Sequence, residues 1–213
     1  MKNIVIVGNG GMAKEVKWLI DYINDNTNEW NFLGYIDKDI YEDGVIGDDT
    51  YICTIKEEVY AVLAIGSPWV RRKIYKKYKE NEYVKFPNMI SPTVRISNSV
   101  QMGEGNIICD NSVLTVNISM GNFNIINYGC TVGHDVNIGN FNIINPGTNI
   151  SGNVTIDNLV QIGTGTKIIQ GKRIGREAVI GAGAVVITDV QANTTVAGVP
   201  ASVIKYQAKD ESI

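Results

Sequence analysis

An aliphatic residue stands at every sixth position of the chain from Ile90 to Val186, and this register holds for seventeen repeats without a break. In a helix, residues at this spacing would be spread around the whole surface, and a strand would place apolar residues at every second position. The pattern therefore predicts a solenoid of stacked coils. The aliphatic positions are Ile90, Ile96, Met102, Ile108, Leu114, Met120, Ile126, Val132, Ile138, Ile144, Ile150, Ile156, Ile162, Ile168, Ile174, Ile180 and Val186.

Each hexad is expected to form one flat side of a triangular coil, with its first residue inside the prism and a small or β-branched fifth residue beside it. Three hexads would close a coil, so the repeat predicts between five and six coils about 4.8 Å apart. The corners require positive φ, which Gly121-Asn122, Gly139-Asn140 and Gly152-Asn153 are expected to provide. The fifth residues include Val136, Thr148, Val154, Thr166, Ala178 and Ala184.

The first part of the chain shows a different pattern. Strands are predicted at 3–7, 31–36 and 58–65, and helices at 12–24 and 69–80. This βαβ order indicates a small parallel sheet with helices beside it. We expect an α/β domain resembling half of a Rossmann fold over residues 1–87, a β-helix over 88–190 and a C-terminal tail over 191–213.

A glycine loop follows the first predicted strand. The segment Gly8-Asn9-Gly10-Gly11-Met12-Ala13 fits the pattern G-x-G-x-x-G/A and opens a helix. Backbone amides at Gly8, Gly10 and Gly11 would meet phosphates, and Asp37, after the second strand, would accept from a ribose or base. Fewer than 90 residues precede the hexads, too few for both halves of a dinucleotide fold. A tight turn without a ligand is the alternative.

The composition of the chain limits the partners and the compartment that we expect. The 213 residues carry a net charge of -3, and the pI is near 5.2, so neither nucleic acid nor a membrane surface is an expected partner. The apolar run at the start is too short for a secretion signal, which favours the cytoplasm. The three cysteines, Cys53, Cys109 and Cys130, are odd in number and widely spaced, so we expect reduced, space-filling thiols.

The chain contains one histidine, His134, inside Thr131-Val132-Gly133-His134-Asp135-Val136. One histidine cannot form a three-histidine zinc site, so no metal is expected. An imidazole can act as a general base at neutral pH, and Asp135 could orient it. Adjacent strand residues point to opposite faces, so the pair requires a nearby corner, or the carboxylate must come from elsewhere. A structural histidine is the alternative.

The segment from Asn127 to Phe141 resembles the NeuD/PglD-like sugar acetyltransferases, a branch of the hexapeptide-repeat acyltransferases. The resemblance covers essentially the whole chain. It continues through Asn145-Pro146-Gly147, Gly152-Asn153-Val154, Gly181-Ala182-Gly183-Ala184-Val185-Val186 and Ala197-Gly198-Val199-Pro200-Ala201. It implies a left-handed parallel β-helix, a homotrimer, acetyl-CoA as co-substrate, and a C-terminal tail that borders the coenzyme A groove.

The resemblance also implies roles for single residues. It makes His134 the catalytic base and Asp135 its orienting acid, and it places Asn127 near the acetyl group and the substrate. Gly152 and Ala182 match positions where backbone groups meet the thioester and the pantetheine arm. Backbone N–H donors there could stabilise the oxyanion of the tetrahedral intermediate.

In the first domain the resemblance implies a nucleotide-sugar site, to which Gly66 and Ser67 would contribute a second loop. The following arginines, Arg71 and Arg72, are expected to be exposed helix residues rather than phosphate ligands. Many family members carry histidine where this chain has Met12 or Ile143. A family contact made by an imidazole at either position is therefore not expected in this chain.

The function expected from these observations is acetyl-CoA-dependent N-acetylation of the 4-amino group of a nucleotide-linked 4-amino-4,6-dideoxy sugar, in bacterial surface glycan (O-antigen) biosynthesis. O-acetylation of sialic acid or another sugar is an alternative. A non-enzymatic β-helix scaffold is an alternative of a different class. The sequence leaves open the sugar, the nucleotide (UDP, dTDP, GDP or CMP) and the length of the acyl group.

Overall fold

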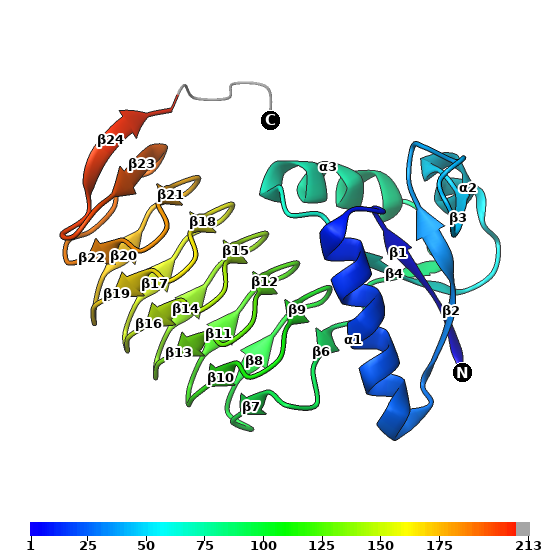
Figure 1. Ribbon diagram of the computed structural model, residues 1–213, viewed down its shortest axis with the longest axis horizontal. Helices are drawn as coiled ribbons and strands as arrows, with labels where there is room; N and C mark the ends of the chain where they lie inside the picture. The colour runs from blue at the N-terminus through cyan, green and yellow to red at the C-terminus, as the bar shows by residue number, and fades with distance from the viewer. Residues whose placement is uncertain (208–213) are drawn as a thin grey trace. The chain divides into compact units, whose positions relative to one another are not determined.

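The computed structural model describes residues 1–207, apart from the side chain of Asn26 (Figure 1). The chain divides into two compact units, Met1–Pro92 and the part that begins at Thr93. Residues 208–213, the end of the expected tail over 191–213, lie outside the described residues.

The first unit is built on a parallel sheet with the strand order β3-β2-β1-β4-β5. The predicted strands and helices are present, whereas β3, α2 and β5 were not predicted, because all three are short and carry no clear periodicity. From β1 the chain first adds β2 and β3 on one side and then β4 and β5 on the other, so the strand order reverses between β1 and β4. In such sheets, ligands bind at the carboxyl ends of the strands at this point. The elements are β1 (Lys2–Val7), α1 (Gly11–Thr27), β2 (Trp30–Ile36), β3 (Val45–Gly47), α2 (Asp49–Thr54), β4 (Val59–Leu63), α3 (Pro68–Tyr78) and β5 (Val84–Lys85).

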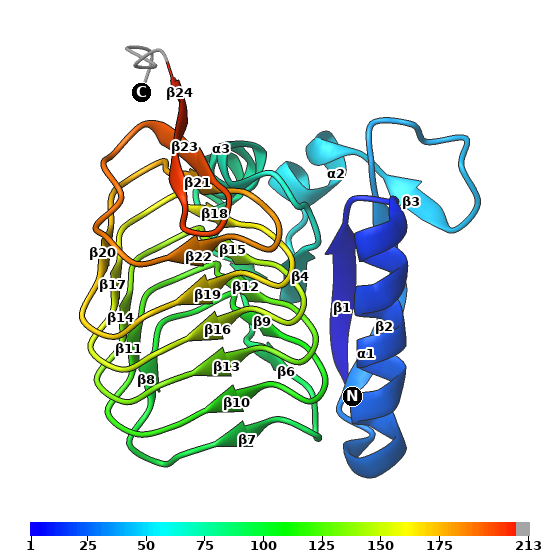
Figure 2. The same ribbon diagram turned by 60° about the vertical axis from the view of Figure 1, so that its left-hand side comes forward.

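The hexads form a triangular parallel β-helix, with three columns of two-residue strands (Figure 2). Each strand pairs with the strand 18 residues further along, as Val113 does with Thr131. The prediction that three hexads close one coil is therefore confirmed.

The strands of the β-helix fall into three sheets. The first contains β7 (Arg95–Ile96), β10 (Val113–Leu114), β13 (Thr131–Val132), β16 (Asn149–Ile150), β19 (Lys167–Ile168) and β22 (Val185–Val186). The second contains β8 (Gln101–Met102), β11 (Ser119–Met120), β14 (Asn137–Ile138), β17 (Thr155–Ile156) and β20 (Arg173–Ile174). The third contains β6 (Met89–Ile90), β9 (Ile107–Ile108), β12 (Ile125–Ile126), β15 (Ile143–Ile144), β18 (Gln161–Ile162) and β21 (Val179–Ile180), continued by β23 (Thr194–Ala197) and β24 (Ser202–Tyr206).

The interior follows the predicted hexad pattern. The aliphatic residues from Ile108 onward are buried, and so are all of the small or β-branched fifth residues named above. Burial fails only in the first coil, where Ile96 is exposed and Ile90 and Met102 are half-buried, because those strands end their sheets and have a neighbouring coil on one side only.

Positive φ recurs at every sixth residue, always at the fourth position of the hexad. The expectation that Gly121, Gly139 and Gly152 supply it is wrong, because of the three predicted pairs only Asn153, with φ 60°, adopts it. Gly139 instead stacks on the next coil, where an added Cβ would lie 3.0 Å from the carbonyl oxygen of Asp157. The hexad residues with positive φ are Gly105, Asn111, Asn117, Phe123, Gly129, Asp135, Phe141, Gly147, Asn153, Leu159, Gly165, Gly171, Glu177 and Gly183.

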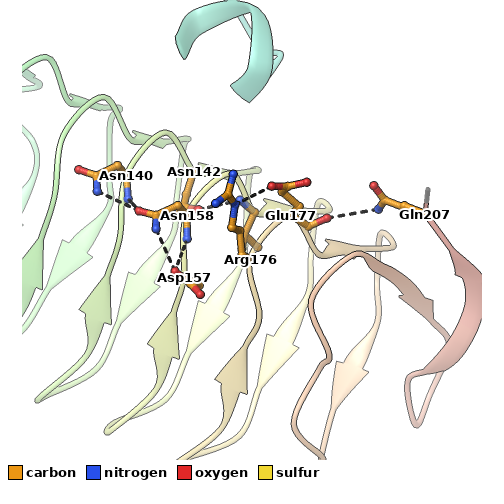
Figure 3. A network of polar contacts seen from close by, with 8 residues as sticks. Asn140, Asn142, Asp157, Asn158, Arg176, Glu177 and Gln207 are labelled. Carbon is orange, nitrogen blue, oxygen red and sulfur yellow. Dashed lines mark hydrogen bonds and ion pairs between the residues drawn. The ribbon is translucent and has the colours of Figure 1, made fainter. Parts of the chain in front are cut away.

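Asparagine ladders reinforce the corner between the second and third sheets. Inside the prism, Asn124 and Asn142 are fully buried, and the Asn142 N–H donates to Asn124 Oδ1 at 2.9 Å. On the outside, Asn140 Nδ2 donates to Asn158 Oδ1 at 2.9 Å (Figure 3). Further along this corner, Gln207 Nε2 donates to the carbonyl oxygen of Glu177 at 3.3 Å, which fastens the end of the described chain to the last coils (Figure 3).

Candidate functional site

His134 and Asp135 lie at the turn that connects β13 to β14, at the third and fourth positions of their hexad. We call the stacked turns between the first and second sheets the histidine corner. Asp135 has φ 58°, so the chain bends between the two residues and does not continue as a strand. Their side chains therefore meet, with Nδ1 of His134 2.8 Å from Oδ2 of Asp135. This is the nearby corner that the pair requires.

The carboxylate is held on both of its oxygens. Oδ1 of Asp135 accepts a hydrogen bond from Nδ2 of Asn117 at 3.2 Å, and the Asp135 N–H donates to the carbonyl oxygen of Val116 at 3.1 Å. The hydrogen bond from His134, followed by that from Asn117, lowers the pKa of Asp135 below its ordinary value. The carboxylate is therefore ionised at neutral pH.

The pair fixes which imidazole nitrogen can accept a proton. An ionised carboxylate only accepts hydrogen bonds, so Nδ1 of His134 is the nitrogen that donates to Asp135. In the neutral ring this leaves Nε2 as the acceptor. The His134 side chain is 50% exposed, so solvent reaches part of the imidazole.

Gly152 lies one coil after His134, directly against the imidazole. A Cβ at this position would come within 2.5 Å of Cε1 and 2.8 Å of Cδ2 of His134, and it would also meet Nε2. The absence of a side chain at Gly152 therefore gives the ring its space. Its role toward coenzyme A stays a prediction.

Asn127 and Ala182 lie at a different corner, in the turns that follow β12 and β21 of the third sheet. Asn127 is 8% exposed, and its Nδ2 donates to Oδ1 of Asn145, 18 residues further along, at 3.4 Å. Ile143 is buried on β15, away from the histidine corner. The structure thus joins His134, Asp135 and Gly152 within one chain and places Asn127 and Ala182 elsewhere on the prism.

The glycine loop of the first unit borders a cleft of about 510 Å³ at the carboxyl ends of β1 and β2. Gly8, with φ 104°, and Asp37 both line this cleft. Gly10 precedes α1 without a side-chain cap, and an added Cβ on Gly10 or Gly11 would meet nothing within 4 Å. The first N–H groups of α1 are thus without a side-chain partner at Gly10, as a phosphate site requires.

The second loop, Gly66-Ser67, caps α3 and binds a buried arginine, which the sequence did not indicate. Ser67 caps α3, with Oγ accepting from the N–H of Val70 at 3.5 Å. Arg71 is 1% exposed and donates through Nη1 to the carbonyl oxygens of Ile65 at 2.6 Å and Gly66 at 3.4 Å. Burial lowers the pKa of Arg71 to about 9.

The expectation that Arg71 and Arg72 are exposed is therefore wrong. Arg71 is buried, because the loop carbonyls need its donors, and Arg72 is half-buried.

Among residues 1–207, no group of three or more histidine, cysteine, aspartate or glutamate side chains could hold a metal ion. The three cysteines are free, with Cys109 and Cys130 buried and Cys53 half-buried. Within the same range, the structure contains no helix with the length and hydropathy of a membrane span.

Both units of the chain are similar to known proteins. Residues 3–78 match the family model of the PglD N-terminal domain. PerB from Caulobacter crescentus, solved with CoA and GDP-perosamine, superposes with a TM-score of 0.89 at 28% identity, covering 96% of this chain and 98% of that chain. The acetyltransferase domain of PglB from Neisseria gonorrhoeae, solved with acetyl coenzyme A, superposes with a TM-score of 0.86 at 27% identity, covering 95% and 99%.

WeeI from Acinetobacter baumannii superposes with a TM-score of 0.86 at 29% identity, covering 96% of this chain and 100% of that chain. A comparison with curated proteins finds no match. The matched N-terminal domain, the near-complete overlap with these structures and the uninterrupted hexads together show an N-terminal α/β domain followed by a left-handed parallel β-helix, and they support the resemblance to the NeuD/PglD-like sugar acetyltransferases.

Proposed function

We propose that the protein transfers an acetyl group from acetyl-CoA to the 4-amino group of a nucleotide-linked 4-amino-4,6-dideoxy sugar, for bacterial surface glycan biosynthesis. The observation that carries this proposal is the His134–Asp135 pair, with Nδ1 bonded to the carboxylate at 2.8 Å and Nε2 left to accept a proton. The similarity to PerB, solved with CoA and GDP-perosamine, supports the substrate class.

The reaction is a direct transfer. Nε2 of His134 accepts a proton from the amine as the nitrogen attacks the thioester carbonyl carbon. The new C–N bond forms, the C–S bond breaks, and the proton passes from His134 to the leaving thiolate to give free coenzyme A. The backbone N–H group of Gly152, beside the imidazole, is proposed to stabilise the oxyanion, and Ala182, which lies at another corner, would contribute its N–H group from a neighbouring subunit.

A covalent acyl-enzyme is not required. Cys130 precedes His134 in the adjoining hexad, but it is buried, its Sγ donates to the carbonyl oxygen of Asn145 at 3.3 Å, and burial raises the pKa of its thiol. A neutral, enclosed thiol is a poor nucleophile.

The nucleotide is proposed to bind in the cleft of the first unit. The backbone amides of Gly8, Gly10 and Gly11 would hold its phosphates, and Asp37 would accept from its ribose or base. Gly66 and Ser67 complete the proposed loop on the other side of the switch point.

We propose a cytoplasmic homotrimer as the working form. His134 stands on a convex corner and is half exposed, so a neighbouring subunit is needed to enclose the substrates. Sedimentation showing a monomer at working concentration would contradict this part of the proposal.

The test is release of free thiol from acetyl-CoA in the presence of UDP-, dTDP-, GDP- and CMP-linked 4-amino sugars. His134→Ala is expected to lower kcat by about 10² to 10⁴ with the preferred sugar, the usual size of a general-base contribution. Asn98→Ala, an exposed residue at the equivalent position two coils earlier, is the control and should retain activity. Near-normal turnover by His134→Ala would refute the proposed role of His134.

The remaining outcomes separate the other functions. Acetylation of a free sugar hydroxyl, without competition from a nucleotide, would favour O-acetylation. Absence of coenzyme A binding by calorimetry would favour a scaffold.

A further inference from the structure

Asn117 stands in the coil before Asp135, 18 residues earlier, at the same position of the hexad. It has φ 57°, and its side chain is exposed apart from one contact: Nδ2 donates to Oδ1 of Asp135 at 3.2 Å. Its own backbone is anchored in turn, because the Asn117 N–H donates to Oγ of Ser99 at 2.9 Å. A chain of hydrogen bonds therefore runs up the histidine corner from Ser99 to the imidazole.

The residue type at position 117 meets two demands at once. The backbone is left-handed there, which Gly, Asn and Asp adopt more readily than other residues. Of these three, only asparagine carries a side-chain N–H. Asp would place a second carboxylate against Asp135, and Gly would leave Oδ1 of Asp135 to solvent.

This contact does not follow from the turn alone. Asn111 has the same hexad position, a φ of 59° and a backbone N–H that donates to Oγ1 of Thr93 at 3.0 Å. One coil later, however, stands Gly129, which offers no carboxylate. Asn111 is thus a matched residue at another corner, without the link to an acid.

We propose that Asn117 is a positioning residue for the proposed general base. By holding one carboxylate oxygen of Asp135, it keeps the other oxygen on Nδ1 of His134, and this maintains the tautomer in which Nε2 accepts the proton. Without the amide, the half-exposed Asp135 carboxylate rotates, and the imidazole loses its fixed tautomer and orientation. The kinetic part of this inference rests on the proposed function.

The kinetic test uses Asn117→Gly, which retains the left-handed backbone. We expect kcat for thiol release to fall roughly tenfold, a moderate misplacement of a catalytic group, with the KM values for acetyl-CoA and the sugar nucleotide unchanged. Asn117→Asp, which also fits the backbone, is expected to lose more, because two carboxylates then repel each other. Asn111→Gly and Asn111→Asp are the matched controls and should behave as wild type.

A double-mutant cycle separates positioning from a general structural effect. If Asn117 acts through Asp135, then Asn117→Gly changes nothing further in an Asp135→Gly background, where glycine again tolerates the positive φ. A loss of full size in that background would overturn the inference.

A second measurement needs no activity. Because the chain contains one histidine, the ¹⁵N signals of its imidazole need no assignment. At about pH 9, where imidazole is neutral, we expect one protonated and one unprotonated nitrogen in the wild type, and averaged shifts in Asn117→Gly. Unchanged shifts would overturn the inference. Wild-type protein inactive on every sugar would instead overturn the proposed function, with the NMR comparison still deciding the role of Asn117.

Discussion

Replacement of Gly152 by alanine tests how the site holds its imidazole. Gly152 has no positive φ, so alanine fits the local backbone, and the change acts through the new Cβ alone. That Cβ would stand 2.5 Å from Cε1 and 2.8 Å from Cδ2 of His134. Carbon atoms in contact are about 3.5 to 4.0 Å apart, so the ring must move by about 1 Å or turn into solvent.

The expected effects on activity and stability differ in size. A 1 Å displacement of a catalytic group costs about 10²-fold, so kcat should fall by about two orders of magnitude. The His134 side chain is half exposed and can move outward, so the free energy of unfolding should fall by only about 1 kcal/mol, the cost of an unfavourable rotamer. Thiol release and thermal unfolding together measure both effects.

The KM for acetyl-CoA separates the two roles considered for Gly152. If its main contribution is space for the ring, kcat falls and KM stays unchanged; if its backbone binds the thioester, KM rises as well. Gly103→Ala is the control, because its Cβ would meet the Asn122 side chain, at the corner between the second and third sheets and not at the histidine corner. It should lower stability and leave kcat intact. Wild-type kcat in Gly152→Ala would show that the ring does not need this space.

Three further predictions concern the glycine loop, the buried asparagine ladder and Asp135. Gly10→Ala should leave Tm unchanged, because its Cβ would meet no protein atom, and it should raise the KM for the sugar nucleotide, whose phosphates are proposed to bind there. Gly8→Ala should lower Tm, because φ is 104° and the new Cβ would lie 3.1 Å from the carbonyl oxygen of Ala64. Asn124→Val should lower the free energy of unfolding by about 1 to 3 kcal/mol in urea titration, because it leaves the buried N–H of the next ladder asparagine unpaired. The folded-state pKa of Asp135 is lowered, so the stability it contributes is present above its unfolded pKa of about 3.9 and is lost as pH falls through the folded value. Asp135→Asn should therefore flatten the fall of Tm below about pH 4, and an unchanged slope would contradict this assignment.

The sequence determines the architecture because the hexad pattern is set by burial. Ile126, Ile144 and Ile162 are each 0% exposed, and any slip of one residue would expose the whole column. Prediction from the hexad pattern fails where burial depends on hydrogen bonds between coils. Asn124 and Asn142 have polar side chains, yet they are fully buried because each amide bonds to the neighbouring coils. Such satisfaction depends on residues 18 apart and cannot be recognised in a single hexad.

In the candidate site, too, some residues were predictable from the sequence and others were not. The pair His134–Asp135 was predictable from one hexad, since the acid follows the base directly. Asn117 was not predicted, although the 18-residue period would have placed it beside Asp135, because an asparagine at a corner is indistinguishable by type from a turn residue. Arg71 was mistaken for an exposed residue because helix periodicity does not reveal that the loop before α3 presents two carbonyl oxygens to it.

The left-handed fourth position explains why this fold can carry an acid and a base side by side. In a straight strand His134 and Asp135 would point to opposite faces, and one of the two would enter the prism, where an unpaired ionisable group would be costly. With φ 58° Asp135 turns back to the imidazole and remains in contact with water. The same conformation recurs at Asn117, so the amide and the carboxylate stack directly across neighbouring coils. A rigid repeat thus turns sequence neighbours and residues one coil apart into one hydrogen-bonded group, without any loop inserted to build it.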